Sequence, residues 1–128
     1  MSVYLIAPHC DNLPVDWWTA VKYRFTLINP RTGKTMSMTA KNEFESGSNE
    51  WGWQKFISLD DAQSMFVEND GVVLQTEVVV LEEEVGETPS FVFTHKFRNL
   101  SGISKHARLL SEVHSDSFGN SYYTLLYP

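Results

Sequence analysis

The alternation of apolar and polar residues between positions 17 and 28 constrains the fold of this chain more than any other feature. The apolar residues occupy odd positions, namely Trp17, Val21, Tyr23, Phe25 and Leu27. Lys22, Arg24 and Thr26 lie between them and face the other way. A period of two is that of a β-strand, because successive side chains point to opposite faces. We therefore predict a long strand in an antiparallel sheet, with one face buried.

Short strand-like segments separated by turn residues make up most of the remaining chain. We predict strands at residues 2–7, 17–28, 36–44, 49–57, 72–81, 91–97, 107–114 and 121–127. One short helix is predicted after Ser58, which has the character of an N-cap and is followed by acidic residues. Strands do not alternate with helices as they do in parallel sheets. The predicted fold is therefore all-β, an eight-stranded antiparallel β-sandwich with one short helix.

Composition limits the number of domains and the classes of partner. The 128 residues suit one domain, 1–128, and 42% of them are hydrophobic, which is enough to form a core. The net charge of −6 argues against nucleic acid and anionic membranes as main partners, because both require a basic surface. Residues 72–81 are the most apolar run and are too short to span a bilayer, and we expect no signal peptide. With the single cysteine Cys10, we expect a reducing compartment, the cytoplasm or the nucleus.

Residues 49–57 gather two tryptophans, a phenylalanine and an isoleucine around one glycine. Alternation places the side chains in two rows, with Trp51, Trp53 and Ile57 on one face and Gly52, Gln54 and Phe56 on the other. A glycine within a strand marks a bulge or a close approach by another backbone. The aromatic residues beside it either wall a ligand groove or belong to the core, and this segment alone favours the core.

Residue patterns for catalysis or metal binding are poor, so we expect no enzymatic activity, no cofactor and no metal. His9 and Cys10 are adjacent on an extended chain, where neighbouring side chains point in opposite directions and do not readily pair. The remaining histidines lack metal-binding spacing: His95, His106 and His114. Residues 33–35 have the Gly-Lys-Thr of a phosphate-binding loop, but Ile28 stands where the motif requires glycine, and a strand is predicted to follow.

Several segments together resemble the MATH (meprin and TRAF-homology) domain. Residues 17–29 precede the segment 50–57, whose Glu-Trp-Gly-Trp-Gln-Lys-Phe-Ile sequence resembles the family's Asp-Trp-Gly-Phe segment and its following Phe-Ile pair. Residues 69–74 resemble the turn and last strand of the family. Glu50 replaces the family's aspartate and Trp53 its phenylalanine, and both changes are conservative. The motifs are closest to the MATH domains of the speckle-type Cullin adaptor and of the herpesvirus-associated ubiquitin-specific protease.

The order of the segments departs from that of the family. In the family, a segment similar to residues 91–101 comes first, strands similar to 110–113 and 122–128 follow, and one similar to 2–6 comes next. We therefore interpret the chain as a circularly permuted domain. Its parts are residues 1–81, similar to the family's C-terminal portion, 82–89, a linker, and 90–128, similar to the N-terminal portion. The alternative is a fragment cut across two tandem domains, which would complete its fold by exchanging halves with a second copy.

The resemblance implies a binding function without catalysis. Members of the family bind short extended peptides, which pair with the strand that carries the Trp-Gly-Phe segment. Carried over by position, the peptide-binding residues are Tyr4, Tyr23, Asn42, Asn49, Glu50, Trp51, Gly52 and Trp53. For Tyr23, which shares its face with Phe25 and Leu27, core packing and ligand contact are both open.

The residue types in this set indicate the kind of ligand. Glu50 can accept a hydrogen bond from a Ser or Thr hydroxyl, Trp51 and Trp53 offer apolar area, and Gly52 admits a foreign backbone. We expect a short Ser/Thr-containing peptide, bound at about micromolar affinity, in partner recruitment for a ubiquitin-related pathway. A carbohydrate-binding sandwich and a purely structural module remain the alternatives. Because the chain has no heptad segment, we expect a monomer, or a domain-swapped dimer if halves exchange.

Overall fold

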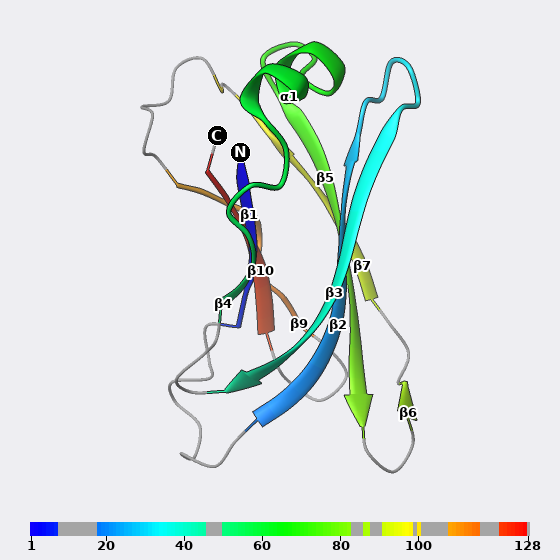
Figure 1. Cartoon of the computed structure of the whole chain (residues 1–128), viewed down its shortest axis with the longest axis vertical. Helices are drawn as coiled ribbons and strands as arrows, with labels where there is room; N and C mark the ends of the chain where they lie inside the picture. Colours follow the sequence, from blue (N-terminus) through cyan, green and yellow to red (C-terminus); the bar gives the residue numbers. More distant parts are fainter. Residues whose placement is uncertain are drawn as a thin grey trace.

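Two antiparallel β-sheets lie face to face, with one short helix at one end of the molecule (Figure 1). The structure is a computed structural model, and the residues it describes are 1–7, 18–45, 50–82, 86–87, 91–98, 100, 108–115 and 121–127. Every strand pairing within these ranges is antiparallel. The predicted all-β sandwich with one short helix is confirmed.

The first sheet contains five strands. They are β1 (Ser2–Ile6), β4 (Glu50–Trp53), β8 (Leu109–Leu110), β9 (His114–Ser115) and β10 (Ser121–Tyr127). Their order is β4–β1–β10–β8, and β9 also pairs with β10. Ser2 lies opposite Tyr127, so the beginning of β1 is directly beside the end of β10. β4 is the terminal strand of this sheet on the side away from β10.

The second sheet also contains five strands. They are β2 (Trp18–Ile28), β3 (Thr35–Glu45), β5 (Val72–Glu82), β6 (Gly86–Glu87) and β7 (Phe91–Phe97). β3, β2 and β5 are neighbours in that order, and β6 and β7 both pair with the far side of β5. β3 is therefore the terminal strand of the second sheet, on the same side of the sandwich as β4 (Figure 1).

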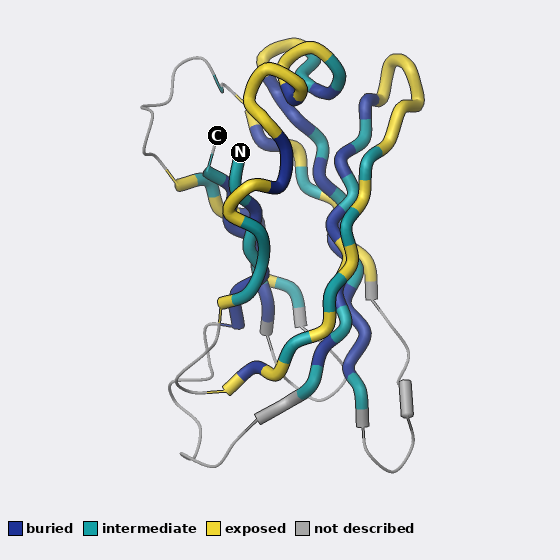
Figure 2. Tube along the Cα trace, in the orientation of Figure 1, coloured by how far each residue is buried: buried dark blue, intermediate teal, exposed yellow. Residues whose placement is uncertain are grey.

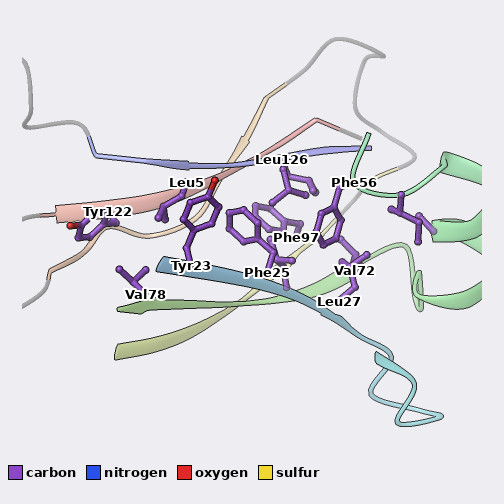
Figure 3. Close-up of a cluster of buried hydrophobic side chains, with 14 of the residues drawn as sticks. Leu5, Tyr23, Phe25, Leu27, Phe56, Val72, Val78, Phe97, Tyr122 and Leu126 are labelled. Atoms are coloured by element: carbon purple, nitrogen blue, oxygen red, sulfur yellow. The ribbon is translucent and has the colours of Figure 1, made fainter. Parts of the chain in front are cut away.

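The core lies between the two sheets and follows the alternation of β2. Val21, Phe25 and Leu27 are fully buried, whereas Arg24 is exposed, as the period of two predicts. Figure 3 shows the buried side chains from both sheets meeting in one layer. Exposed positions concentrate on the β2–β3 turn and on the outer side of the helix (Figure 2). Trp17, expected on the buried face, lies outside the described residues.

Two threonine hydroxyls meet in the middle of this apolar layer. Thr76 of β5 and Thr124 of β10 are both fully buried, and their Oγ1 atoms are 2.8 Å apart. Because β5 and β10 belong to different sheets, this hydrogen bond joins the two layers. Either hydroxyl can be the donor of this bond. A buried hydroxyl without any partner would cost about 1–3 kcal/mol, so the bond spares both threonines that cost.

Residues 49–57 do not form one continuous strand. β4 ends at Trp53, and the chain then turns. Strict alternation would have directed Phe56 away from the core, but the turn allows both Phe56 and Ile57 to be buried. The backbone N–H of Phe56 donates to the carbonyl of Met1 at 3.1 Å, which holds the turned segment beside β1.

The predicted strand at residues 107–114 is also divided, into β8 and β9. Ser111 lies between the two, and its hydroxyl accepts a hydrogen bond from the backbone N–H of Thr124 at 2.8 Å. A side-chain oxygen here replaces a backbone carbonyl of the ladder, so regular pairing is interrupted. The predicted linker, residues 82–89, overlaps the end of β5 and includes β6, while 83–85 and 88–89 lie outside the described residues.

The helix α1 (Leu59–Met65) begins as the sequence predicts. The Ser58 hydroxyl accepts a hydrogen bond from the backbone N–H of Asp61 at 3.1 Å, which is an N-cap. A tight turn follows, in which Asn69 and Asp70 both have positive φ angles, 52° and 60°. Asn and Asp tolerate this conformation better than most residues, so the predicted Asn-Asp-Gly turn is suited to its place. No helix in the described part of the chain is long and apolar enough to span a membrane.

One buried asparagine connects the β2–β3 turn to this helix. The Asn29 amide donates to the Met65 carbonyl at 2.8 Å and to the Glu68 carboxylate at 3.0 Å. Its Oδ1 accepts the backbone N–H groups of Arg31 and Thr32. Arg31 also pairs with Glu68, and its hydrogen bond, together with that from Asn29, lowers the pKa of the Glu68 carboxyl.

Asn29→Ala is expected to lower the free energy of unfolding by about 2–3 kcal/mol, because four partly buried hydrogen bonds of one side chain are lost together. The Arg31→Ala variant, which removes the exposed ion pair with Glu68, should destabilise the fold clearly less. Urea denaturation of the two variants measures both values. Equal effects would contradict the central role of Asn29.

Candidate functional site

Within the described residues, β4 has one edge with which no strand pairs. β4 pairs with β1 on one side, and no described strand pairs with it on the other. In an antiparallel ladder, every second residue of a terminal strand directs its N–H and C=O away from its neighbour. These backbone groups are a template that another extended chain can join.

Trp53 fixes β4 to the second sheet. Its ring lies 5.7 Å from Tyr23, 5.9 Å from Phe25 and 6.0 Å from Phe56, measured between ring centroids. The contacts with Tyr23 and Phe25 are edge-on, which is a favourable arrangement for aromatic pairs. The side chain is nevertheless only partly buried, so Trp53 belongs to the core and also reaches the edge of the sandwich.

Trp51 connects β4 and β3, the terminal strands of the two sheets. Its indole Nε1 donates to the backbone carbonyl of Glu43 in β3 at 2.9 Å. Since β4 and β3 are the edges of different sheets, this hydrogen bond ties the sheets together at their open side. The ring packs against the core and is partly buried. Neither tryptophan is sealed inside the protein.

Tyr23, whose ring contacts Trp53, forms a hydrogen-bonded pair with Asn42 of β3. Only 2% of Tyr23 is exposed, and its hydroxyl donates to Asn42 Oδ1 at 2.6 Å. Burial raises the pKa of the Tyr23 phenol to about 12, so the hydroxyl stays protonated at physiological pH. Figure 3 shows Tyr23 in line with Phe25 and Leu27 along β2. Of the two interpretations open for Tyr23, core packing is the one the structure shows.

The backbone of the neighbouring strand β1 leaves no room for a side chain at Gly52. A Cβ atom at this position would lie 2.7 Å from the Cα of Tyr4 and closer still to the Val3 carbonyl oxygen. The close approach expected at this glycine is therefore made by β1. The same Cβ would be 3.0 Å from Cδ1 of Tyr4, so the Tyr4 ring lies over the bare backbone of Gly52. Tyr127 contacts the other side of Tyr4 edge-on at 6.1 Å.

The described site residues predicted from the sequence lie toward the two faces of the sheet that contains β4. Trp51 and Trp53 face the second sheet, where Tyr23 and Asn42 lie, whereas Gly52 pairs with Tyr4 on the outer face. Glu50, two residues before Gly52, is exposed on that outer side. Asn49 lies outside the described residues. The Glu43 carbonyl was not predicted, because a backbone acceptor leaves no signal in the sequence.

Gly52→Ala should lower the free energy of unfolding by about 3 kcal/mol or more, because β4 must move away from β1 to admit the methyl group. The control is Gly33→Asn in the β2–β3 turn, where φ is 76° and nothing lies within 4 Å of the added Cβ. Asparagine tolerates this φ, so the control should change stability little. Thermal unfolding compares the two, and a mild effect at Gly52 would contradict the close approach.

The histidines form no catalytic arrangement within the described residues. His95 packs against Phe97, with 4.6 Å between ring centroids, and burial lowers its pKa. His114 stacks on Phe93 at 4.0 Å, which joins β9 to β7 at the side opposite β4. No group of three metal-ligating residues occurs in the described ranges. His9, Cys10 and His106 lie outside them.

Comparison with known families identifies the family of this chain. The sequence model of the MATH domain matches residues 1–78, and the chain belongs to this family. MATH domains are non-catalytic modules that mediate interactions between proteins. Neither a curated protein nor a solved structure matches the chain.

Proposed function

We propose that this domain binds short extended peptides containing Ser or Thr by strand addition to the free edge of β4. The terminal position of β4 in its sheet carries this proposal, since a peptide can continue the sheet there with backbone hydrogen bonds. Family membership supports it, because MATH domains mediate interactions between proteins. The partly exposed Trp51 and Trp53 supply apolar area at the same edge.

An added strand would present its side chains alternately to two different surfaces. On the outer face, it would meet Tyr4 and Glu50, and a Ser or Thr hydroxyl could donate to the carboxylate. On the inner face, it would meet Trp51, Trp53 and Asn42. The backbone then provides affinity, and the two faces provide selectivity.

The setting of this binding is part of the same proposal. The motif similarity to the speckle-type Cullin adaptor and to the ubiquitin-specific protease favours partner recruitment in a ubiquitin-related pathway. We place the domain in the cytoplasm or nucleus, as a monomer that performs no chemistry itself. Affinity should be about micromolar, because the peptide must be ordered when it binds.

Trp51→Ala is expected to weaken peptide binding about tenfold or more, because it removes an apolar anchor from the edge. An array of eight-residue peptides with Ser or Thr among small and apolar residues supplies the ligand, and fluorescence anisotropy measures affinity. The matched control is Leu59→Ala, which truncates an exposed apolar side chain on α1. Circular dichroism establishes that both variants are folded. Wild type that binds no peptide, or a folded Trp51→Ala that binds as wild type does, would refute the proposal.

Phosphorylation of the contacting hydroxyl should weaken binding. A phosphate would bring close to two negative charges toward Glu50 on a domain of net charge −6. The same array, printed with phosphorylated and unmodified peptides, tests this. Tighter binding of the phosphopeptides would contradict the role given to Glu50.

We also propose that the chain is a circularly permuted MATH domain. In this arrangement, the family's connection would run between the strands that correspond to β10 and β1. Tyr127 and Ser2 lie opposite one another in these strands, so a short loop could bridge them. β5 and β7 are antiparallel neighbours, and residues 83–90 join them. The family match ends at residue 78, within β5, which is compatible with this order.

A reordered chain tests the permutation. Residues 91–127, a short Gly/Ser linker and residues 2–82 should fold as a monomer whose melting temperature is similar to that of the original chain. A control opened between Tyr23 and Arg24, in the middle of β2, should not fold. Failure of the reordered chain would contradict the permutation, and an original chain that is an obligate dimer would favour exchange of halves.

A further inference from the structure

Asn42 interrupts an otherwise apolar row on the inner face of β3. The residues of this row alternate with exposed ones and are Met36, Met38, Ala40, Asn42 and Phe44. The other four pack in or against the core. The row lies at the edge of the second sheet, beside the Glu43 carbonyl that accepts the Trp51 indole N–H. The amide is therefore the polar group that an inward-facing ligand side chain would meet on β3.

The Tyr23 hydroxyl determines which end of this amide is available. It donates to Oδ1 at 2.6 Å, and among the described residues it is the partner of the Asn42 side chain. The phenol is held in place by Phe25, Phe44 and Trp53, whose ring centroids lie 5.7–6.3 Å away. Oδ1 keeps one further lone pair, whereas the two N–H groups of Nδ2 have no partner among the described residues and can only donate hydrogen bonds to a ligand.

We infer that the peptide carries a neutral hydrogen-bond acceptor, such as a Ser or Thr hydroxyl or a carboxamide, at its inward-facing position opposite Asn42. This inference rests on the proposed binding at β4 and adds a second polar contact, on the face opposite Glu50. An aliphatic side chain there would leave the amide covered and unpaired, which is costly. A carboxylate would satisfy the amide but would be repelled by the exposed Glu43, Glu45 and Glu50 around this edge.

A positional exchange of Thr for Val in the peptide tests the inference, because the two side chains have nearly the same shape. Each residue of the tightest unphosphorylated peptide from the array is made Thr in one version and Val in the other. At one inward-facing position, wild type should favour Thr about five- to tenfold, the ratio expected from one hydrogen bond. Asn42→Leu should abolish or reverse this preference, while the preference at the Glu50 contact stays unchanged.

The Tyr23→Phe variant separates the role of the amide from its effect on folding. It removes the bond that holds Oδ1, so the amide can turn and the Thr preference should fall, although the peptide still binds. The double variant Tyr23→Phe with Asn42→Leu leaves no buried hydroxyl unpaired, and it serves where Asn42→Leu alone is unstable. Both variants are compared with wild type by their Thr-to-Val ratio, which a general loss of stability would not alter.

The outcomes distinguish this inference from the proposed function. If no peptide binds wild type, the proposed function fails and the inference with it. If peptides bind but no inward position prefers Thr, or if the preference persists in the folded Asn42→Leu or double variant, the inference is overturned and strand addition stands. A single position whose preference disappears with Asn42 supports it.

Discussion

The packing of Trp53 against the aromatic residues of β2 is the contact on which the arrangement of this edge depends. It joins a four-residue strand to the opposite sheet, and a strand that short can form few backbone hydrogen bonds. The pairing of Gly52 with Tyr4 sets how closely β4 approaches β1, and the Trp51 indole fixes it to β3. Together these contacts connect β4 to β1, β2 and β3.

In the proposed mode of binding, stability and recognition would share the same residues. Tyr23 is a core residue, and its hydroxyl also fixes the position of the Asn42 Oδ1 atom. Trp51 connects the two sheets, and in the proposed binding it would also contact the ligand. A substitution at either residue changes folding and binding at once, so the informative measurement is a ratio between two closely similar ligands.

Much of the fold could be predicted from local patterns. The alternation in β2 identified its buried face, the Ser58 N-cap located the start of α1, and the absence of strand–helix alternation indicated a sandwich. The end of β4 was not predicted, because the alternation of residues 49–57 indicates one strand, and only the burial of both Phe56 and Ile57 shows that the chain turns there. The division of residues 107–114 depends on Ser111 bonding to Thr124, a contact between separate strands that neither segment records alone.

The residue types of the candidate site come from the sequence and stay a prediction as a binding site, whereas their geometry could not be predicted. The Trp-Gly-Trp segment and its resemblance to the MATH family identified the strand, while the terminal position of β4 is a property of the whole sheet. Gly52 was expected to face a foreign backbone, but it faces β1, because a glycine signals a close approach without naming the neighbour. The amide orientation of Asn42 likewise follows from Tyr23, nineteen positions away in the chain.

The hydroxyl pair of Thr76 and Thr124 has a consequence for how the two layers find one another. Apolar side chains tolerate sliding, since a leucine contacts one neighbour nearly as well as the next. A hydrogen bond does not tolerate sliding, because displacement of one sheet by a single pleat would leave both hydroxyl oxygens without a partner among apolar side chains. The pair therefore fixes the alignment of the two sheets. It adds little to the total stability, but it makes every slipped stacking of the sandwich less favourable than the correct one.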